Sequence, residues 1–97
     1  MTETAHIRIF GRVQGVFYRQ WTMTTAQEKG LSGWVRNRVD GTVEAVFKGD
    51  ESVVAAMIEQ CRRGSPMAFV TKIEYMVTPD AVMPEIVDGE FFQQATV

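Results

Sequence analysis

Residues 31–48 read LSGWVRNRVDGTVEAVFK, and this stretch decides the fold. Two runs rich in β-branched and aromatic residues, Leu31 to Arg38 and Thr42 to Lys48, flank the dipeptide Asp40-Gly41. Asp-Gly between two such runs is a strong short-range signal for a hairpin, because both residues tolerate a positive φ. The stretch therefore predicts two antiparallel neighbouring strands.

A strand and a helix are predicted on each side of this hairpin. The alternation of apolar and polar residues predicts the strands. Glycine stops, a capping aspartate and an apolar stripe at helical spacing predict the helices. In chain order the segments are a strand at His6 to Phe10, a helix from about Phe17 to Lys29, the hairpin, a helix from Asp50 to Arg63, and a strand at Phe69 to Val77.

The order strand, helix, strand, strand, helix, strand gives two split βαβ units with right-handed crossovers. It predicts an α+β, ferredoxin-like βαββαβ sandwich, an antiparallel sheet with both helices on one face. Thr78 to Gly89 contains two prolines and is expected to be an irregular connection, and Phe91 to Val97 a fifth strand at an edge. The length of 97 residues fits a single domain over 1–97.

The charge balance argues against a broad basic surface. The formal net charge is −2 and the pI is near 5.3, which disfavours nucleic acid and anionic membrane as partners. The charges are unevenly divided, however. Residues 1–48 hold seven Lys and Arg against four acids, whereas residues 49–97 hold three against eight. An anion is therefore expected to bind to the first half of the chain.

The chain has one cysteine, Cys61, and one histidine, His6. A single cysteine cannot form an internal disulfide, and no Cys/His cluster has metal-ligand spacing, so no metal and no cofactor is predicted. The polar start of the chain lacks a signal-peptide pattern, and no apolar run approaches the length of a membrane span. We expect a cytoplasmic protein.

The segment from Gly11 to Arg19 reads GRVQGVFYR and joins the first strand to the first helix. Exposed amides at a helix start carry partial positive charge, and a guanidinium can close a bidentate fork on two phosphate oxygens. The segment therefore suits an anion, although a strand-to-helix loop with two glycines needed for its geometry also explains it. It fits neither the Walker pattern nor a dinucleotide motif, and Cys61 lies far away on an apolar helix stripe, as a core residue would.

A second group of residues, 33–41, covers the first strand of the predicted hairpin and its Asp-Gly turn. Alternation along residues 33–38 puts Trp34 and Arg36 on one side and Val35 and Asn37 on the other. A partly enclosed amide needs a partner, so Asn37 is a candidate functional residue. It also fits the start of the Asp-Gly turn.

Together the two groups closely resemble the two signatures of the acylphosphatase family. The match runs through GRVQGVFYR at 11–19, then Gly33-Trp34-Val35-Arg36-Asn37 and Asp40-Gly41. The resemblance implies a metal-free hydrolase that cuts small acyl phosphates into a carboxylate and inorganic phosphate, which would also act as product inhibitor. We expect a monomer without nucleic-acid or membrane partners.

The resemblance also implies roles for individual residues. Arg19 would bind the phosphoryl group and Asn37 would hold the attacking water. The cradle for the remaining phosphoryl oxygens would be the backbone amides of Gln14, Gly15, Val16, Phe17 and Tyr18. Chemistry agrees, because a carboxylate leaving group with a conjugate-acid pKa of about 4 hardly needs a general acid.

Other polar residues are expected outside the site. His6 begins the first strand while the loop follows its other end, so a catalytic role is not expected. Arg12 is expected to be a surface or rim charge, and Arg36 and Arg38 to point away from Asn37 and stay solvated.

Three other functions share this fold. An RNA-binding module would need aromatic residues at RNP-like spacing, which Thr42 to Lys48 lacks. A regulatory anion binder could keep the loop but gives no reason for Asn37 to accompany Arg19. A module that handles carbamoyl phosphate within a larger protein also resembles this family.

Overall fold

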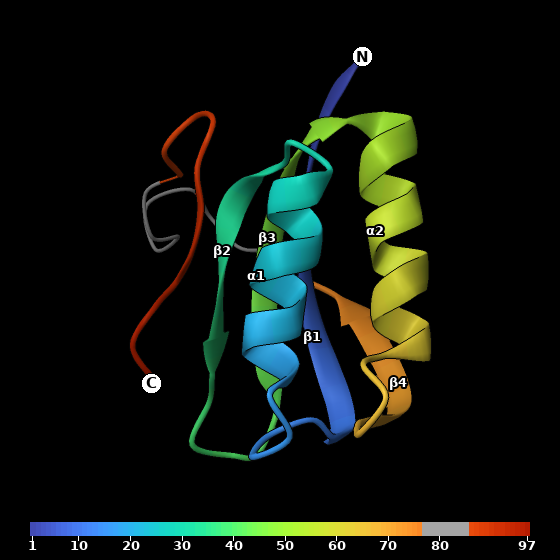
Figure 1. The fold of residues 1–97 in the computed structure, drawn as a ribbon, viewed down its shortest axis with the longest axis vertical. Helices are drawn as coiled ribbons and strands as arrows, with labels where there is room; N and C mark the ends of the chain where they lie inside the picture. Colours follow the sequence, from blue (N-terminus) through green and yellow to red (C-terminus); the bar gives the residue numbers. More distant parts are fainter. Residues whose placement is uncertain (77–85) are drawn as a thin grey trace.

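The computed structural model describes residues 1–76 and 86–97 and has two layers, a five-stranded sheet and two helices (Figure 1). Both helices lie side by side on one face of the sheet, as Figure 1 shows. The elements are β1 (Thr2–Arg12), α1 (Tyr18–Glu28), β2 (Ser32–Asn37), β3 (Val43–Asp50), α2 (Glu51–Arg63), β4 (Phe69–Tyr75) and β5 (Phe91–Gln93). The predicted ferredoxin-like βαββαβ arrangement is confirmed.

The strand order is β4-β1-β3-β2-β5. β1 pairs antiparallel with β3 and β4, and β2 pairs antiparallel with β3. The four strands of the predicted arrangement are antiparallel, and the additional edge strand, β5, pairs parallel with β2. β5 is also shorter than the predicted strand over 91–97: beyond Gln93 only isolated backbone bonds join the chain to β2 and its turn, such as Gln94 N–H to the Val35 carbonyl at 2.8 Å. Most of the connection predicted at 78–89 lies outside the described residues.

β1 is longer than its sequence pattern predicts. It begins at Thr2 rather than His6, and its first residues pair one by one with the end of β3, from Thr2 opposite Asp50 onward. Thr2, Glu3 and Thr4 are polar and exposed, so side-chain burial does not account for their pairing. Backbone hydrogen bonds to β3 extend the strand where the apolar alternation has ended.

The core lies between the sheet and the helices. β1 contributes Ile7 and Ile9 to it, fully buried at alternate positions, and α2 contributes a stripe that includes Cys61. Burial raises the pKa of the Cys61 thiol to about 12. Cys61 is therefore a core residue, as predicted, with little thiolate at neutral pH.

The other face of the sheet carries a buried charge cluster around Glu44, which is only 3% exposed. One carboxylate oxygen accepts from Arg36 Nε and Arg38 Nη1, both at 2.8 Å, and the other lies 2.5 Å from His6 Nε2. The guanidinium of Arg36 also lies 4.7 Å from the centre of the Trp34 ring. Arg36 and Arg38 do point away from Asn37, but the expectation that they stay solvated is wrong, because the opposite position on β3 holds an acid.

Replacing this acid should lower stability. Glu44→Gln removes the charge that compensates two arginines, and we expect a loss of about 2–3 kcal/mol in the free energy of unfolding, less than for a fully buried pair because the arginines are partly exposed. Urea unfolding followed by circular dichroism measures it. The matched control is Glu74→Gln, whose carboxylate pairs with Lys72 at the surface and should cost little.

The same variant should change the pH dependence of stability. Burial raises the pKa of Glu44, but the donated hydrogen bonds outweigh burial and leave the pKa lowered. An acid with a lowered folded-state pKa stabilises the fold above its unfolded pKa, about 4.3, and loses this contribution as pH falls through the folded value. Stability of Glu44→Gln should therefore fall less on acidification below about pH 4.3 than wild type, and parallel curves would contradict the assignment.

Candidate active site

The loop between β1 and α1 turns through two left-handed residues. Gly15 has φ 73°, and Phe17, the residue that precedes α1, has φ 60° and ψ 22°. Among the described residues, Phe17 is the only non-glycine with a positive φ. No hydrogen bond within the described chain is donated by a backbone amide of residues 14–18. The loop thus presents a series of unbonded N–H groups where a helix begins.

The starts of the two helices differ. Asp50 caps α2, accepting from the Ser52 amide at 3.0 Å, and Glu51 adds an acid in the first turn. α1 has no side-chain cap and no acid in its first turn. Neither a cap nor an acid in its own first turn therefore compensates the positive end of the α1 dipole.

The side chain of Gln14 ties this loop to the β2–β3 turn. Its Nε2 donates to the Arg38 carbonyl at 2.7 Å and to the Thr42 carbonyl at 2.8 Å. The turn is itself closed by Asp40, whose carboxylate accepts from the Thr42 amide at 3.0 Å and the Thr42 hydroxyl at 2.6 Å. These bonds hold the pKa of Asp40 below its usual value. The loop and the end of β2 are thereby fixed to each other.

Tyr18 anchors the first residue of α1 to α2. Its ring is buried, and its hydroxyl donates to the Cys61 carbonyl at 2.8 Å. Burial raises the pKa of Tyr18 strongly, so the phenol stays protonated and remains a donor. The loop is therefore held at both ends, at Gln14 by the turn and at Tyr18 by the second helix.

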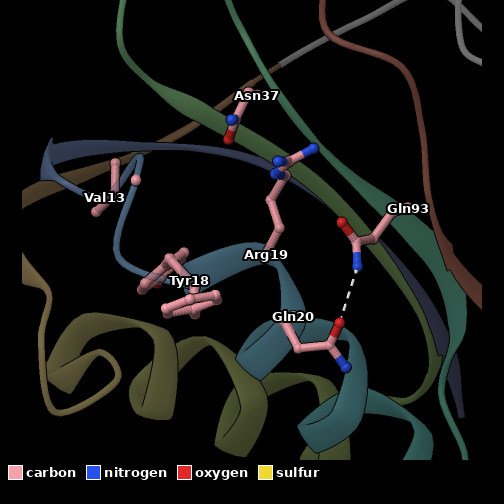
Figure 2. Close-up of a pocket in the computed structure, with 8 residues that line it drawn as sticks. Val13, Tyr18, Arg19, Gln20, Asn37 and Gln93 are labelled. Carbon is pink, nitrogen blue, oxygen red and sulfur yellow. Dashed lines mark hydrogen bonds between the residues drawn. The ribbon is translucent and has the colours of Figure 1, made fainter.

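A cavity of about 320 Å³ opens between the loop, α1 and the end of β2. Figure 2 shows Arg19 and Asn37 reaching into it from α1 and β2. No ion pair among the described residues includes Arg19. The Asn37 Oδ1 atom is buried and accepts no hydrogen bond within the described chain. The cavity thus holds a cation without an ion-pair partner and an acceptor without a hydrogen-bond partner in the described part of the chain.

The structure brings most of the predicted site residues together. Arg19, Asn37, Gly15, Phe17 and Tyr18 line the cavity. The side chain of Gln14 turns to the hairpin, and that of Val16 is buried in the core. Among the residues expected to lie outside, His6 contacts Glu44, and Arg12 is exposed and does not line the cavity.

Sequence reasoning missed three residues that line the cavity, Val13, Gln20 and Gln93. Gln93 lies on β5 and its Nε2 donates to Gln20 Oε1 at 3.4 Å (Figure 2). No spacing relates Gln93 to the loop, because it reaches the site only through the parallel pairing of β5 with β2. Gln20 follows Arg19 directly and could have been included with it.

In the described part of the chain, no three His, Cys, Asp or Glu side chains are grouped so that they could hold a metal ion. No helix there is long and apolar enough to cross a membrane.

Comparison with known proteins gives a consistent result. The acylphosphatase family model matches residues 5–85. An acylphosphatase of Rhodospirillum rubrum is 56% identical over 79 residues, 81% of this chain and 85% of the relative, and one of Haloquadratum walsbyi is 50% identical over 92 residues, 92% and 95% of the two chains. The crystal structure of the Bacillus subtilis acylphosphatase superposes with a TM-score of 0.80 at 31% identity and covers 97% of this chain and 99% of its own.

The bonds of Gln14 generate a prediction about stability. Gln14→Met keeps the length of the side chain but removes both bonds from the loop to the turn, so the Arg38 and Thr42 carbonyls keep only the backbone bonds that they accept from the Gly41 and Arg38 amides. We expect a loss of about 1–3 kcal/mol in the free energy of unfolding, measured by urea titration. The control is Gln60→Met on the exposed side of α2, expected to be nearly neutral. Equal effects of the two substitutions would show that Gln14 does not fix the turn.

Proposed function

Because the chain belongs to the acylphosphatase family, a family of hydrolases of acyl phosphates, we propose that Arg19 holds the phosphoryl group and Asn37 the attacking water. The observation that carries the proposal is that both side chains line one cavity beside the unbonded loop amides. Within the described chain, Arg19 forms no ion pair and Asn37 Oδ1 accepts no hydrogen bond.

The phosphoryl group would lie in the loop. Amides of residues 14–18 and the positive end of α1 suit its equatorial oxygens, on which charge is spread in the transition state. The Arg19 guanidinium adds a charged bidentate donor from the first turn of the same helix. Because these donors are fixed before substrate binds, they need little reorganisation during the reaction.

Asn37 would orient the nucleophile. Its Oδ1 is a buried acceptor without a partner in the described chain. It can accept a hydrogen bond from a water molecule and so aim the water oxygen at phosphorus. The water oxygen forms the new P–O bond, the bond from phosphorus to the acyl oxygen breaks, and the electron pair leaves with the carboxylate. Both hydrogens of the water end on the phosphate, and no general acid is needed for so weakly basic a leaving group.

Several finer statements belong to the same proposal. We propose that residues 1–97 form one domain, that the protein acts in the cytoplasm as a monomer without nucleic-acid partners, and that inorganic phosphate is both product and competitive inhibitor. The site consists of two side chains and one loop of a single chain, so it needs no second copy to be complete, which supports the monomer. Sedimentation of the protein with and without phosphate tests it.

The reaction class is tested by phosphate release from acetyl phosphate in the presence of a chelator, with an ordinary phosphate monoester as control. Hydrolysis in ¹⁸O-labelled water adds the position of attack. We expect label in phosphate and none in acetate. Label in acetate, or activity on the monoester alone, would contradict the proposal.

Arg19→Lys should lose about a hundredfold or more in kcat/KM, because an ammonium retains the charge but cannot form the bidentate fork. Steady-state kinetics with acetyl phosphate measure it. Arg12→Lys is the control at the other end of the loop segment and should keep near-normal turnover, since Arg12 is exposed and does not line the cavity. A folded Arg19→Lys protein with wild-type turnover would show that the fork is not used.

Asn37→Ala should reduce kcat strongly while leaving the Kd for inorganic phosphate within a few fold. An amide that orients water acts in the transition state and contributes little to binding the anion. Turnover, phosphate affinity and melting temperature should be measured on the same preparations. Unchanged turnover with a lowered melting temperature would make Asn37 a residue of the turn only.

A further inference from the structure

An apolar groove of about 250 Å³ lies next to the catalytic cavity. It runs between the start of α1 and the segment that follows α2, and its walls include Phe17, Trp21, Pro66 and Met67. The lining is almost entirely apolar. Its polar members are Gln20 and Ser65, whose hydroxyl is buried and without a partner among the described residues.

Neither the exposure nor the backbone conformation of Phe17 is what packing of the core would produce. Its side chain is 83% exposed, and its backbone is left-handed, a conformation that is strained for a bulky residue. Met67, on the opposite wall, is 67% exposed. Two large apolar side chains that face solvent beside a catalytic cavity suggest a binding surface rather than packing.

The groove and the cavity are adjacent, because Phe17 and Gln20 line both. Asn37 in the cavity and the outer wall of the groove lie on different sides of the loop. Asn37 ends β2, on the α1 side of the molecule, whereas Pro66 and Met67 belong to the connection between α2 and β4 on the other side (Figure 1). The loop that would hold the phosphoryl group lies between them.

Phosphoryl transfer places the attacking and leaving oxygens roughly in line through phosphorus. A water held by Asn37 therefore directs the leaving carboxylate to the opposite side of the loop, which is the side of the groove. This inference rests on the proposed roles of Arg19 and Asn37.

We propose that the groove is the acyl subsite, and that the enzyme prefers acyl phosphates whose acyl group is an apolar chain of several carbons. Phe17 and Met67 form its two walls and the indole of Trp21 supports it. A two-carbon acyl group has only a methyl group to place against this apolar surface and leaves most of the groove in contact with water. A hydroxylated or charged acyl group would be desolvated there without a matching set of partners.

Acetyl, butyryl and hexanoyl phosphate test the proposal. Their leaving carboxylates are almost equally basic, so differences in kcat/KM report binding of the chain rather than intrinsic reactivity. Each methylene that enters the groove should raise kcat/KM about two- to fourfold. A flat series in the wild-type protein would overturn the proposal.

Met67→Gln should reduce this chain-length dependence while leaving kcat/KM for acetyl phosphate unchanged, because Met67 does not line the catalytic cavity. Met67→Leu should restore it. Tyr75→Gln is the matched control: Tyr75 is 65% exposed, like Met67, and lies at the far end of β4, so its series should match wild type. Identical series for Met67→Gln and wild type would place the chain elsewhere.

The outcomes separate this proposal from the proposed function. If acetyl phosphate is hydrolysed, Arg19→Lys abolishes hydrolysis and the series is flat, the groove is not the acyl subsite and the catalytic roles stand. If the series rises but Arg19→Lys keeps full turnover, the catalytic roles fail and with them the in-line argument for the groove. Melting temperatures of all variants exclude unfolding as the cause of any loss.

Discussion

The backbone amides of residues 14–18 have no acceptor within the described chain, and much of the surrounding structure serves to hold them in place. Backbone polar groups of a folded protein are nearly always paired, so a run of free amides needs a rigid frame and a solvent or ligand to bond with. β1 ends just before the run, Gln14 fixes one end to the hairpin and Tyr18 fixes the other to α2. α2, whose start is capped by Asp50, shows the ordinary solution that α1 lacks.

The distribution of charge across the sheet complements this frame. β2 carries two arginines close to Asn37, and either could in principle compete for an anion. Both point to the other face, where the buried carboxylate of Glu44 accepts from them. Arg19 is therefore the cation of the cavity, and a net charge of −2 for the whole chain is compatible with a local anion site. The division follows from alternation along β2, which sends Asn37 to one face and its arginine neighbours to the other.

Much of this could be predicted from the sequence, and the failures have physical causes. Apolar alternation and the Asp-Gly turn predict four strands, and glycine stops, a cap and an apolar stripe predict two helices, all in the order found. The two signature segments point to Arg19 and Asn37, which line one cavity in the structure. β5 has only three residues and pairs parallel with β2. A segment this short has no sequence pattern that indicates whether it pairs parallel or antiparallel. Gln93 reaches the cavity, and the Gln14 side chain reaches the hairpin, through tertiary contacts alone. The ion pairs of Glu44 depend on the register between β2 and β3, which places Glu44 opposite Arg36. The local sequence pattern does not reveal that register, so it does not predict these ion pairs.

The central claim, that the loop amides bind the phosphoryl group, can be tested residue by residue by following the backbone amide signals in ¹H–¹⁵N NMR spectra during titration with inorganic phosphate. The account predicts saturable shifts concentrated at residues 14–19 with one dissociation constant. The Ser52 amide at the capped start of α2 should stay unchanged. Unmoved signals at 14–18, or shifts centred on Arg62 and Arg63 at the other end of α2, would contradict it.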